Sequence, residues 1–290
     1  MELLLDFWAA YRSTVAFSIV NAFFALSTYA VLAAGILSFA TVAFAAFGGF
    51  LGAQMALSLG LNIVWLVPIT ALAGLVCAYL VAMVFLRLES HWMALASLAL
   101  ILITRVVVIN VPSATGGVNG LSVPLSISLT ALVAILLVVM IIFHRLARSW
   151  YGIAATAVRE DPAVAASLGI EARRVQLIAF CISGAVGGAG GMVLALILKF
   201  LSPDTYFIHL AFTMIAAVVL GGSYHWAGAI IGAAVFTALP VATQAIIPEF
   251  QEVANGVVLL LIMIFMPRGL VDPRAIRLRR QARQSQQASP

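Results

Sequence analysis

Charged residues are scarce in this sequence, and lysine and cysteine are nearly absent. Asp, Glu, Lys and Arg make up 9% of its 290 residues, whereas about 25% is usual in a soluble domain. Apolar residues make up 64%, against roughly 45–50% in soluble proteins. A soluble fold of this length needs much more polar surface, so the composition excludes that class. It indicates a protein that crosses a membrane several times.

The motifs of several enzyme classes are missing as well. The single lysine, Lys199, is followed by Phe-Leu-Ser-Pro, so the chain has no Gly-x-x-x-x-Gly-Lys-Ser/Thr loop and is not itself a P-loop ATPase. The two cysteines, Cys77 and Cys181, lie in apolar segments, and the four histidines lack metal-ligand spacing. Glu160 and Asp161 are the only adjacent carboxylates, and neighbours at a helix start do not share a face. We therefore expect no catalytic residue, metal or cofactor in this chain.

Long uncharged runs define the membrane segments. No Asp, Glu, Lys or Arg occurs from Ser13 to Leu86, a length that crosses a hydrocarbon core of ~30 Å about three times. Either 39–59, which contains three glycines, or the short 205–222 could be a re-entrant or broken helix. We expect an all-α, polytopic membrane protein with roughly 8–10 transmembrane helices. The predicted hydrophobic segments are 13–37, 39–59, 62–86, 92–111, 125–143, 177–198, 205–222, 226–247 and 253–267.

The arginines predict the orientation of the chain. The loop 144–176 and the segment after Met266 carry most of the basic residues, so the positive-inside rule places both in the cytoplasm. The sequence divides into a transmembrane domain, 1–270, and a basic cytoplasmic tail, 271–290. The tail either anchors the topology or lies along the anionic inner leaflet. The first residues lack the positive charge of a secretory signal, so we expect the first span to be retained.

The loop 144–176 is the only long polar connection between membrane segments, which makes it a natural place to bind a soluble partner. Asp161 followed by Pro162 predicts a helix start, because Asp caps free N–H groups and Pro suits the first turn. Gly169 predicts the end of this short helix, since glycine readily adopts the left-handed conformation there. The composition is also compatible with a solvated loop whose arginines only set the topology.

A few polar residues interrupt the predicted spans. Arg105 could extend its side chain to the outer surface, make a structural contact or line a substrate path. Asn21 and Asn110 are candidates for a cavity, although hydrogen bonds between helices explain them as well. No acidic residue lies in the spans to couple transport to protons or sodium. The energy for any pumping must therefore come from outside this chain.

Two glycine pairs, Gly48 with Gly52 and Gly228 with Gly232, have the four-residue spacing that lets helices approach closely in lipid. One pair lies in each half of the chain, so they also fit the interrupted helices of an inverted-repeat transporter. Both interpretations are open at this point.

Five stretches of the chain carry a family resemblance. They are LSFATVAFAAFGGFLGA (37–53), TGGVNGLSVP (115–124), AVREDPAVAASLGIEARRVQLIAFCISGAVGGAGG (157–191), SPDTYF with VVLGGSYHWAGAIIGAAV (202–207 and 218–235), and GVVLLLIMIFMPRGL (256–270). In this order they resemble the permease subunits of ABC importers for branched-chain amino acids. The resemblance is to the one of the two paired permeases that carries TGG-x-NGL, and it covers most of residues 30–270.

The resemblance implies a function and a set of partners. The chain would form half of a translocation pathway for branched-chain amino acids, beside a second homologous permease. Two cytoplasmic ATPase subunits would bind ATP and Mg and drive the transport, and an extracytoplasmic binding protein would deliver the solute. The protein would lie in the lipid of the bacterial cytoplasmic membrane with its C-terminus inside, and it would bind no nucleic acid.

The resemblance also implies site residues. The short helix after Asp161 would be a coupling segment, although family members often carry an extra arginine just before this motif, where Ile153 and Thr156 stand. The turn TGGVNGL would lie outside near the binding protein, and a compact turn explains it equally. The expected ATPase-coupling residues are Arg159, Glu160, Asp161, Leu168, Gly169, Ile170, Arg173 and Arg174. The candidates for the substrate path are Asn21, Arg105, Thr115, Gly116, Gly117 and Asn119.

Two other functions stay open. An ABC permease for another small solute, such as urea or a short-chain amide, would share these features. A stand-alone facilitator or channel would work without partner subunits.

Overall fold

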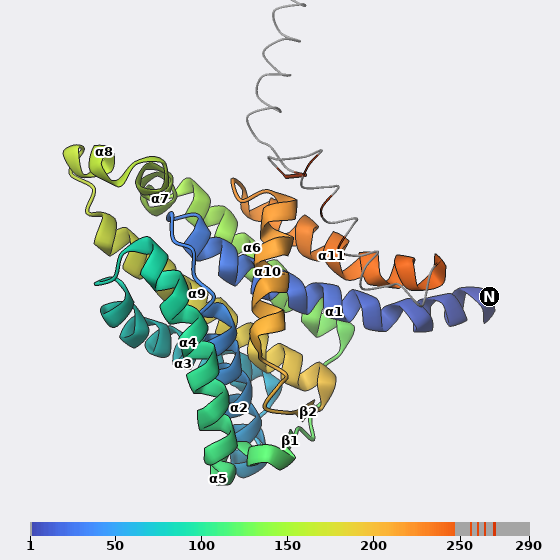
Figure 1. Cartoon of the computed structure of the whole chain (residues 1–290). Helices are drawn as coiled ribbons and strands as arrows, with labels where there is room; N and C mark the ends of the chain where they lie inside the picture. The colour runs from blue at the N-terminus through green and yellow to red at the C-terminus, as the bar shows by residue number, and fades with distance from the viewer. Residues whose placement is uncertain (1, 247–255, 257–259, 261–263, 265–268, 271–290) are drawn as a thin grey trace, which may run out of the picture.

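The computed structural model describes residues 2–246 together with 256, 260, 264, 269 and 270, and this part of the chain is almost entirely helical (Figure 1). The strands β1 (Leu121–Ser122) and β2 (Phe200–Leu201) form one short antiparallel pair. The predicted all-α class is confirmed. The helices are α1 (Glu2–Leu32), α2 (Thr41–Leu59), α3 (Ile63–Phe85), α4 (Ser90–Asn110), α5 (Pro112–Thr115), the 3-10 turn η1 (Gly117–Asn119), α6 (Leu129–Arg148), α7 (Trp150–Glu160), α8 (Pro162–Ser167), α9 (Ala172–Leu198), α10 (Ile208–Gly221) and α11 (Trp226–Ile246).

Six helices are long and apolar enough to cross a membrane: Arg12–Leu32 of α1, α2, α3, His91–Asn110 of α4, α6 and α9. A seventh candidate joins α10 to the Trp226–Pro240 part of α11, with a bend of 118° at the break between them. The predicted segments 205–222 and 226–247 thus form one broken pair, whereas 39–59 is the unbroken α2. Eight of the nine predicted segments lie in the described part of the chain, where they form six spans, or seven if the broken pair counts as one. The segment 253–267 and the tail 271–290 lie outside the described residues.

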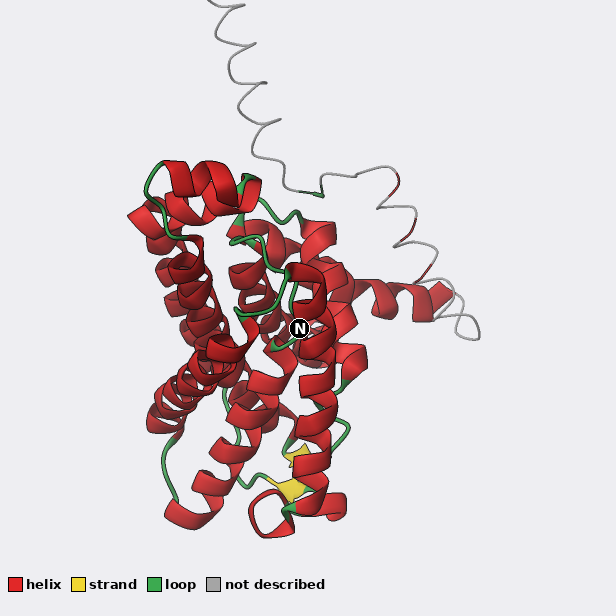
Figure 2. Ribbon diagram, turned by 60° about the vertical axis from the view of Figure 1, so that its left-hand side comes forward, coloured by secondary structure: helices red, strands yellow, loops and turns green. Residues whose placement is uncertain are grey.

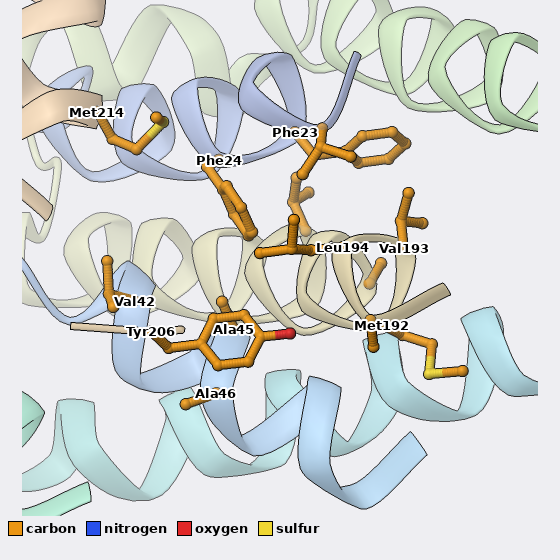
Figure 3. Close-up of a cluster of buried hydrophobic side chains, with 14 of the residues drawn as sticks. Phe23, Phe24, Val42, Ala45, Ala46, Met192, Val193, Leu194, Tyr206 and Met214 are labelled. Atoms are coloured by element: carbon orange, nitrogen blue, oxygen red, sulfur yellow. The ribbon is translucent and has the colours of Figure 1, made fainter. Parts of the chain in front are cut away.

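Helix α9 forms the centre of the fold and packs against α1, α2 and α3. Figure 3 shows side chains of α1, α2 and α9 meeting in one buried apolar cluster. Glycines allow the closest approach: a Cβ on Gly74 would lie 2.2 Å from the carbonyl oxygen of Gly184. A Cβ on Gly188 would lie 2.5 Å from the carbonyl oxygen of Thr70. The backbones of α3 and α9 therefore touch only because these positions carry no side chain.

The two predicted glycine pairs both lie at such contacts. A Cβ on Gly48 would be 2.3 Å from the carbonyl oxygen of Gly188 in α9. A Cβ on Gly232 would be 2.0 Å from that of Ala217, so this second pair packs α11 back onto α10. Close helix packing is confirmed for both pairs. The inverted-repeat interpretation stays a prediction.

The helix bundle has two distinct ends (Figures 1 and 2). The connection of α7 and α8 lies at one end, which we call the α7–α8 end. The two strands, α5 and η1 lie at the other, which we call the strand end. Helix α9 begins at the first end and reaches the second, where β2 follows it directly. The arginine distribution predicts that the α7–α8 end is cytoplasmic.

Candidate functional site

The predicted coupling segment consists of two short helices joined at Asp161. The Asp161 carboxylate Oδ1 accepts hydrogen bonds from the backbone N–H groups of Ala163 at 2.8 Å and Val164 at 3.1 Å. With Pro162 in the first turn, these bonds start α8 where the sequence predicts it.

The end of α8 is equally well defined. Gly169 has a φ of +80°. Its N–H donates to the carbonyl oxygen of Ala166 at 3.0 Å, and the N–H of Ile170 donates to that of Ala165 at 3.0 Å. This pattern is a Schellman motif, which uses a left-handed residue to satisfy the last carbonyls of a helix. The predicted helix and its glycine end are both confirmed, and the turn fixes the direction in which the chain enters α9.

The outer face of α8 is apolar and open. Val164 and Leu168 lie four residues apart, on one side of the helix, and are 56% and 72% exposed. Ala165, on the opposite side, is buried. Large apolar side chains that project from a capped helix outside the predicted spans are typical of a surface that binds another protein.

Arg159, in the last turn of α7, points away from that outer face. Its Nη1 donates to the carbonyl oxygen of Ser223 at 2.5 Å and its Nη2 to the Ser223 hydroxyl at 2.8 Å. Its guanidinium carbon lies 4.3 Å from the ring centroid of Tyr224, within cation–π range. Ser223 and Tyr224 form the break between α10 and α11. One half-buried side chain thus connects the predicted coupling segment to the bent span.

The other predicted coupling residues remain near the surface. Glu171 and Arg174 form an ion pair of 2.6 Å within the first turn of α9, and both are largely exposed. Arg173 and Glu160 are exposed as well, and Ile170 is half-buried. The structure therefore divides the predicted set into outward-facing residues and the inward-facing Arg159. Their roles in coupling remain predictions.

The predicted path residues do not form one site. At the strand end, Arg105 is paired with Asp204, with 2.8 Å between its Nε and the carboxylate oxygen. Its guanidinium carbon lies 5.1 Å from the Phe207 ring centroid. Asn21 lies elsewhere and donates to the Thr237 hydroxyl of α11 at 2.8 Å. A structural contact thus accounts for Arg105, and a hydrogen bond between helices accounts for Asn21.

The turn TGGVNGL is compact. Thr115 donates its hydroxyl to the carbonyl oxygen of Val108 at 2.6 Å, which ties the turn to α4. Gly116 and Gly117 have φ values of +74° and +58°, and Asn119 ends η1. A Cβ on Gly116 would lie 1.9 Å from the carbonyl oxygen of Gly120, so this turn requires glycine. Nothing in this geometry assigns these residues to a path.

A cavity of about 360 Å³ at the α7–α8 end was not apparent from the sequence. It lies between α1, α6, α7, α9 and the α10–α11 break. The Tyr151 hydroxyl is buried there without a hydrogen-bond partner among the described residues. Burial raises the pKa of this phenol, so the hydroxyl stays protonated. The polar run Ser-Tyr-His-Trp after Gly222 was the one sequence signal for this feature and for the contact of Arg159.

Comparison with known proteins adds a family to this geometry. The high-affinity branched-chain amino acid transport system permease protein LivM of Escherichia coli (strain K12) is 30% identical, over 82% of this chain and 64% of that protein. LivM of Salmonella typhimurium is 29% identical with the same coverage. The chain thus spans about 64% of the length of these curated relatives. No solved structure matches it.

The family model described as the permease component of the branched-chain amino acid transport system matches residues 11–267. The match covers most of the chain and all of its described membrane spans. Members of this family are membrane subunits without catalytic activity of their own. The chain therefore belongs to the family of branched-chain amino acid transport permease components.

Proposed function

We propose that this chain forms one half of the translocation pathway of an ABC importer for branched-chain amino acids. It pairs with a second homologous permease and corresponds to the partner that carries TGG-x-NGL. Two cytoplasmic ATPase subunits bind ATP and Mg and drive the transport, while this chain holds no cofactor. An extracytoplasmic binding protein delivers the amino acid. The family match and the similarity to LivM support this proposal.

The proposed location is the bacterial inner membrane, with α7, α8 and the C-terminus in the cytoplasm. Two contacts fit this orientation. Arg159 holds the α10–α11 break at the α7–α8 end, and Asp204 meets Arg105 at the strand end. Helix α9 runs from the α7–α8 end to the strand end, and α10 leads back to the break beside Arg159. The arginine-rich loop 144–176 is the connection that the positive-inside rule places in the cytoplasm.

The observation that carries the proposal is the Arg159 contact between α7 and the α10–α11 break. An ATPase that binds the exposed face of α8 moves α7 with it, because α8 directly follows α7 and packs against it. Arg159 then transmits the movement to the bent span. The angle between α10 and α11 can change at the break without disrupting either helix. The segment formed by α7 and α8 therefore binds the ATPase subunit and also acts on the membrane domain.

The decisive experiment measures uptake of labelled leucine by cells that produce this chain with its second permease, both ATPases and the binding protein. We expect uptake that requires the ATPases and is inhibited by excess isoleucine or valine. The matched control replaces the phosphate-binding lysine of the ATPase subunits. Uptake by the chain alone would establish a facilitator, and inhibition by urea or a short amide without inhibition by isoleucine would establish another solute.

A further inference from the structure

A groove on the outside of the bundle is lined by several polar side chains among apolar ones. It has a volume of about 350 Å³ and lies between α1, α10 and α11. Figure 1 shows α11 running beside α1. Helix α10 is connected to α11 through the break and also packs against α1. The apolar part of the wall includes Phe17 and Phe236. The polar residues that line it are Ser13, Thr14, Asn21, His209, Thr213 and Thr237.

These polar residues lie within candidate spans. Asn21 lies near the middle of Arg12–Leu32, and His209 and Thr213 lie in the first turns of α10, next to the strand end. The other open faces of the spans differ, because α3 and α6 expose large apolar residues such as Leu80 and Leu137. Polar side chains inside a membrane face a protein interior or a water-filled cavity rather than lipid. The groove therefore faces water or a second protein.

The hydrogen bonds leave binding capacity in the groove. Thr213 and Thr237 donate their hydroxyls to the carbonyl oxygens one turn earlier. Asn21 donates one N–H to Thr237, which is one of the four hydrogen bonds that its side chain can make. The described residues offer no partner to its Oδ1. The His209 side chain is exposed. Hydrogen-bonding side chains therefore run from the strand end to the middle of the bundle.

We propose that this groove is the wall that the chain contributes to the translocation pathway, and that Asn21 contacts a small zwitterionic solute at its midpoint. This inference rests on the proposed function. No Asp, Glu, Lys or Arg is among the described residues that line the groove. A zwitterion therefore forms no strong ion pair there and can leave as readily as it enters. A broken helix beside the groove is the arrangement that transporters use at the solute site.

The test labels single cysteines in the complete importer. In a background with Cys77→Ser and Cys181→Ser, the variants Asn21→Cys, Thr213→Cys and Thr237→Cys are treated with a cationic, membrane-impermeant methanethiosulfonate. Leu80→Cys and Leu137→Cys are the controls on the exposed apolar faces. We expect the groove positions to react on the order of 100-fold faster than the controls, because a charged reagent rarely enters hydrocarbon. Excess leucine should slow the reaction at Asn21→Cys.

Three groove positions are labelled, so that the remaining two still give a result if one variant fails to assemble. Labelling of all groove positions as slow as the controls would overturn the proposal and show that the groove is a dry contact with the second permease. Fast labelling that leucine does not slow, but that urea or a short amide slows, would retain the pathway while overturning the proposed solute. Fast labelling that no solute slows would overturn the contact at Asn21.

Discussion

Two arginines hold the two ends of this molecule in different ways. At the strand end, Arg105 pairs with the Asp204 carboxylate and lies over Phe207. At the α7–α8 end, Arg159 donates to Ser223 and lies over Tyr224. Each guanidinium therefore has a hydrogen-bonding partner and an aromatic ring. The difference is that one partner is an oppositely charged carboxylate and the other is a neutral residue at a helix break.

That difference suggests two mechanical roles. The side chains of Arg105 and Asp204 are 38% and 64% exposed, and such exposed ion pairs contribute only about 0–1 kcal/mol. The contact joins α4 to the loop before α10 and holds these two segments together at the strand end. Arg159 is half-buried and donates two hydrogen bonds from a charged group, which contribute more than an exposed ion pair. It therefore connects α7 firmly to the α10–α11 break, as the transmission of a movement requires.

The largest expected effect is that of Arg159→Ala. We expect uptake and solute-stimulated ATP hydrolysis to fall by about 10-fold or more, because two hydrogen bonds from a charged donor are lost. Membrane insertion and basal ATP hydrolysis should not change. The measurement is ATP hydrolysis by the purified complex in lipid discs. The matched control is Arg87→Ala, which removes an exposed arginine from the α3–α4 connection, outside the coupling segment. Equal loss in both variants would contradict the role of Arg159.

Leu168→Ser tests the outward face of the same segment. Loss of a large apolar contact of about 1.5–3 kcal/mol should weaken the binding of the ATPase subunits by about 10- to 100-fold. The measurement is co-purification of the ATPases at falling concentration. Ser167→Ala is the control, because the Ser167 hydroxyl donates to the carbonyl oxygen of Val164 within α8. Unchanged ATPase binding by Leu168→Ser would remove α8 from the interface.

Gly169→Val tests the direction in which α8 leads into α9. The substitution meets no neighbouring atom within 4 Å, but the φ of +80° is unsuited to a β-branched residue. The left-handed conformation costs about 1–2 kcal/mol in such residues, so stimulated ATP hydrolysis should fall several-fold. Replacing Glu160 and Asp161 by Lys should act similarly, through loss of the cap and of favourable contacts with the helix dipole.

Gly60→Val is the matched control, because Gly60 ends α2 with a φ of +59° and equally open space. It carries the same backbone strain away from the coupling segment. If both glycine variants reduce stimulation equally, general destabilisation rather than coupling explains the result.

Asp204→Asn should have the smallest effect. Breaking an exposed ion pair should lower the thermal stability of the complex by about 0–1 kcal/mol and leave transport nearly intact. The difference from the unchanged protein should shrink at high salt, because salt screens exposed charges. Melting curves at low and high salt measure it. A complete loss of uptake would place Arg105 in the path after all.

Local rules were sufficient to predict some features from the sequence. The start of α8 at Asp161 and its end at Gly169 depend on residues a few positions apart, and both were correct. The first six hydrophobic segments were also correct, because span length and hydropathy are properties of one segment. The break after α10 was only one of two alternatives, since a glycine pair alone does not distinguish tight packing from a bend.

Long-range contacts decided the rest. Arg159 and Ser223 are 64 residues apart in sequence, and Asn21 and Thr237 are 216 apart. No pattern within one segment indicates such partners, so Arg159 was grouped with the outward-facing residues. The path candidates likewise combined Asn21 with residues of the strand end. The structure separates Asn21 from the residues of the strand end, because α1 packs against α11 and places Asn21 beside Thr237.

The most direct test of the coupling account is a double-mutant cycle between Arg159→Ala and Tyr224→Leu, measured as stimulated ATP hydrolysis by the complex in lipid discs. If Arg159 acts through the α10–α11 break, the double variant should be no more impaired than Arg159→Ala alone, because both changes interrupt one connection. Independent effects that multiply in the double variant would contradict the account, since α7 would then reach the membrane domain by another route.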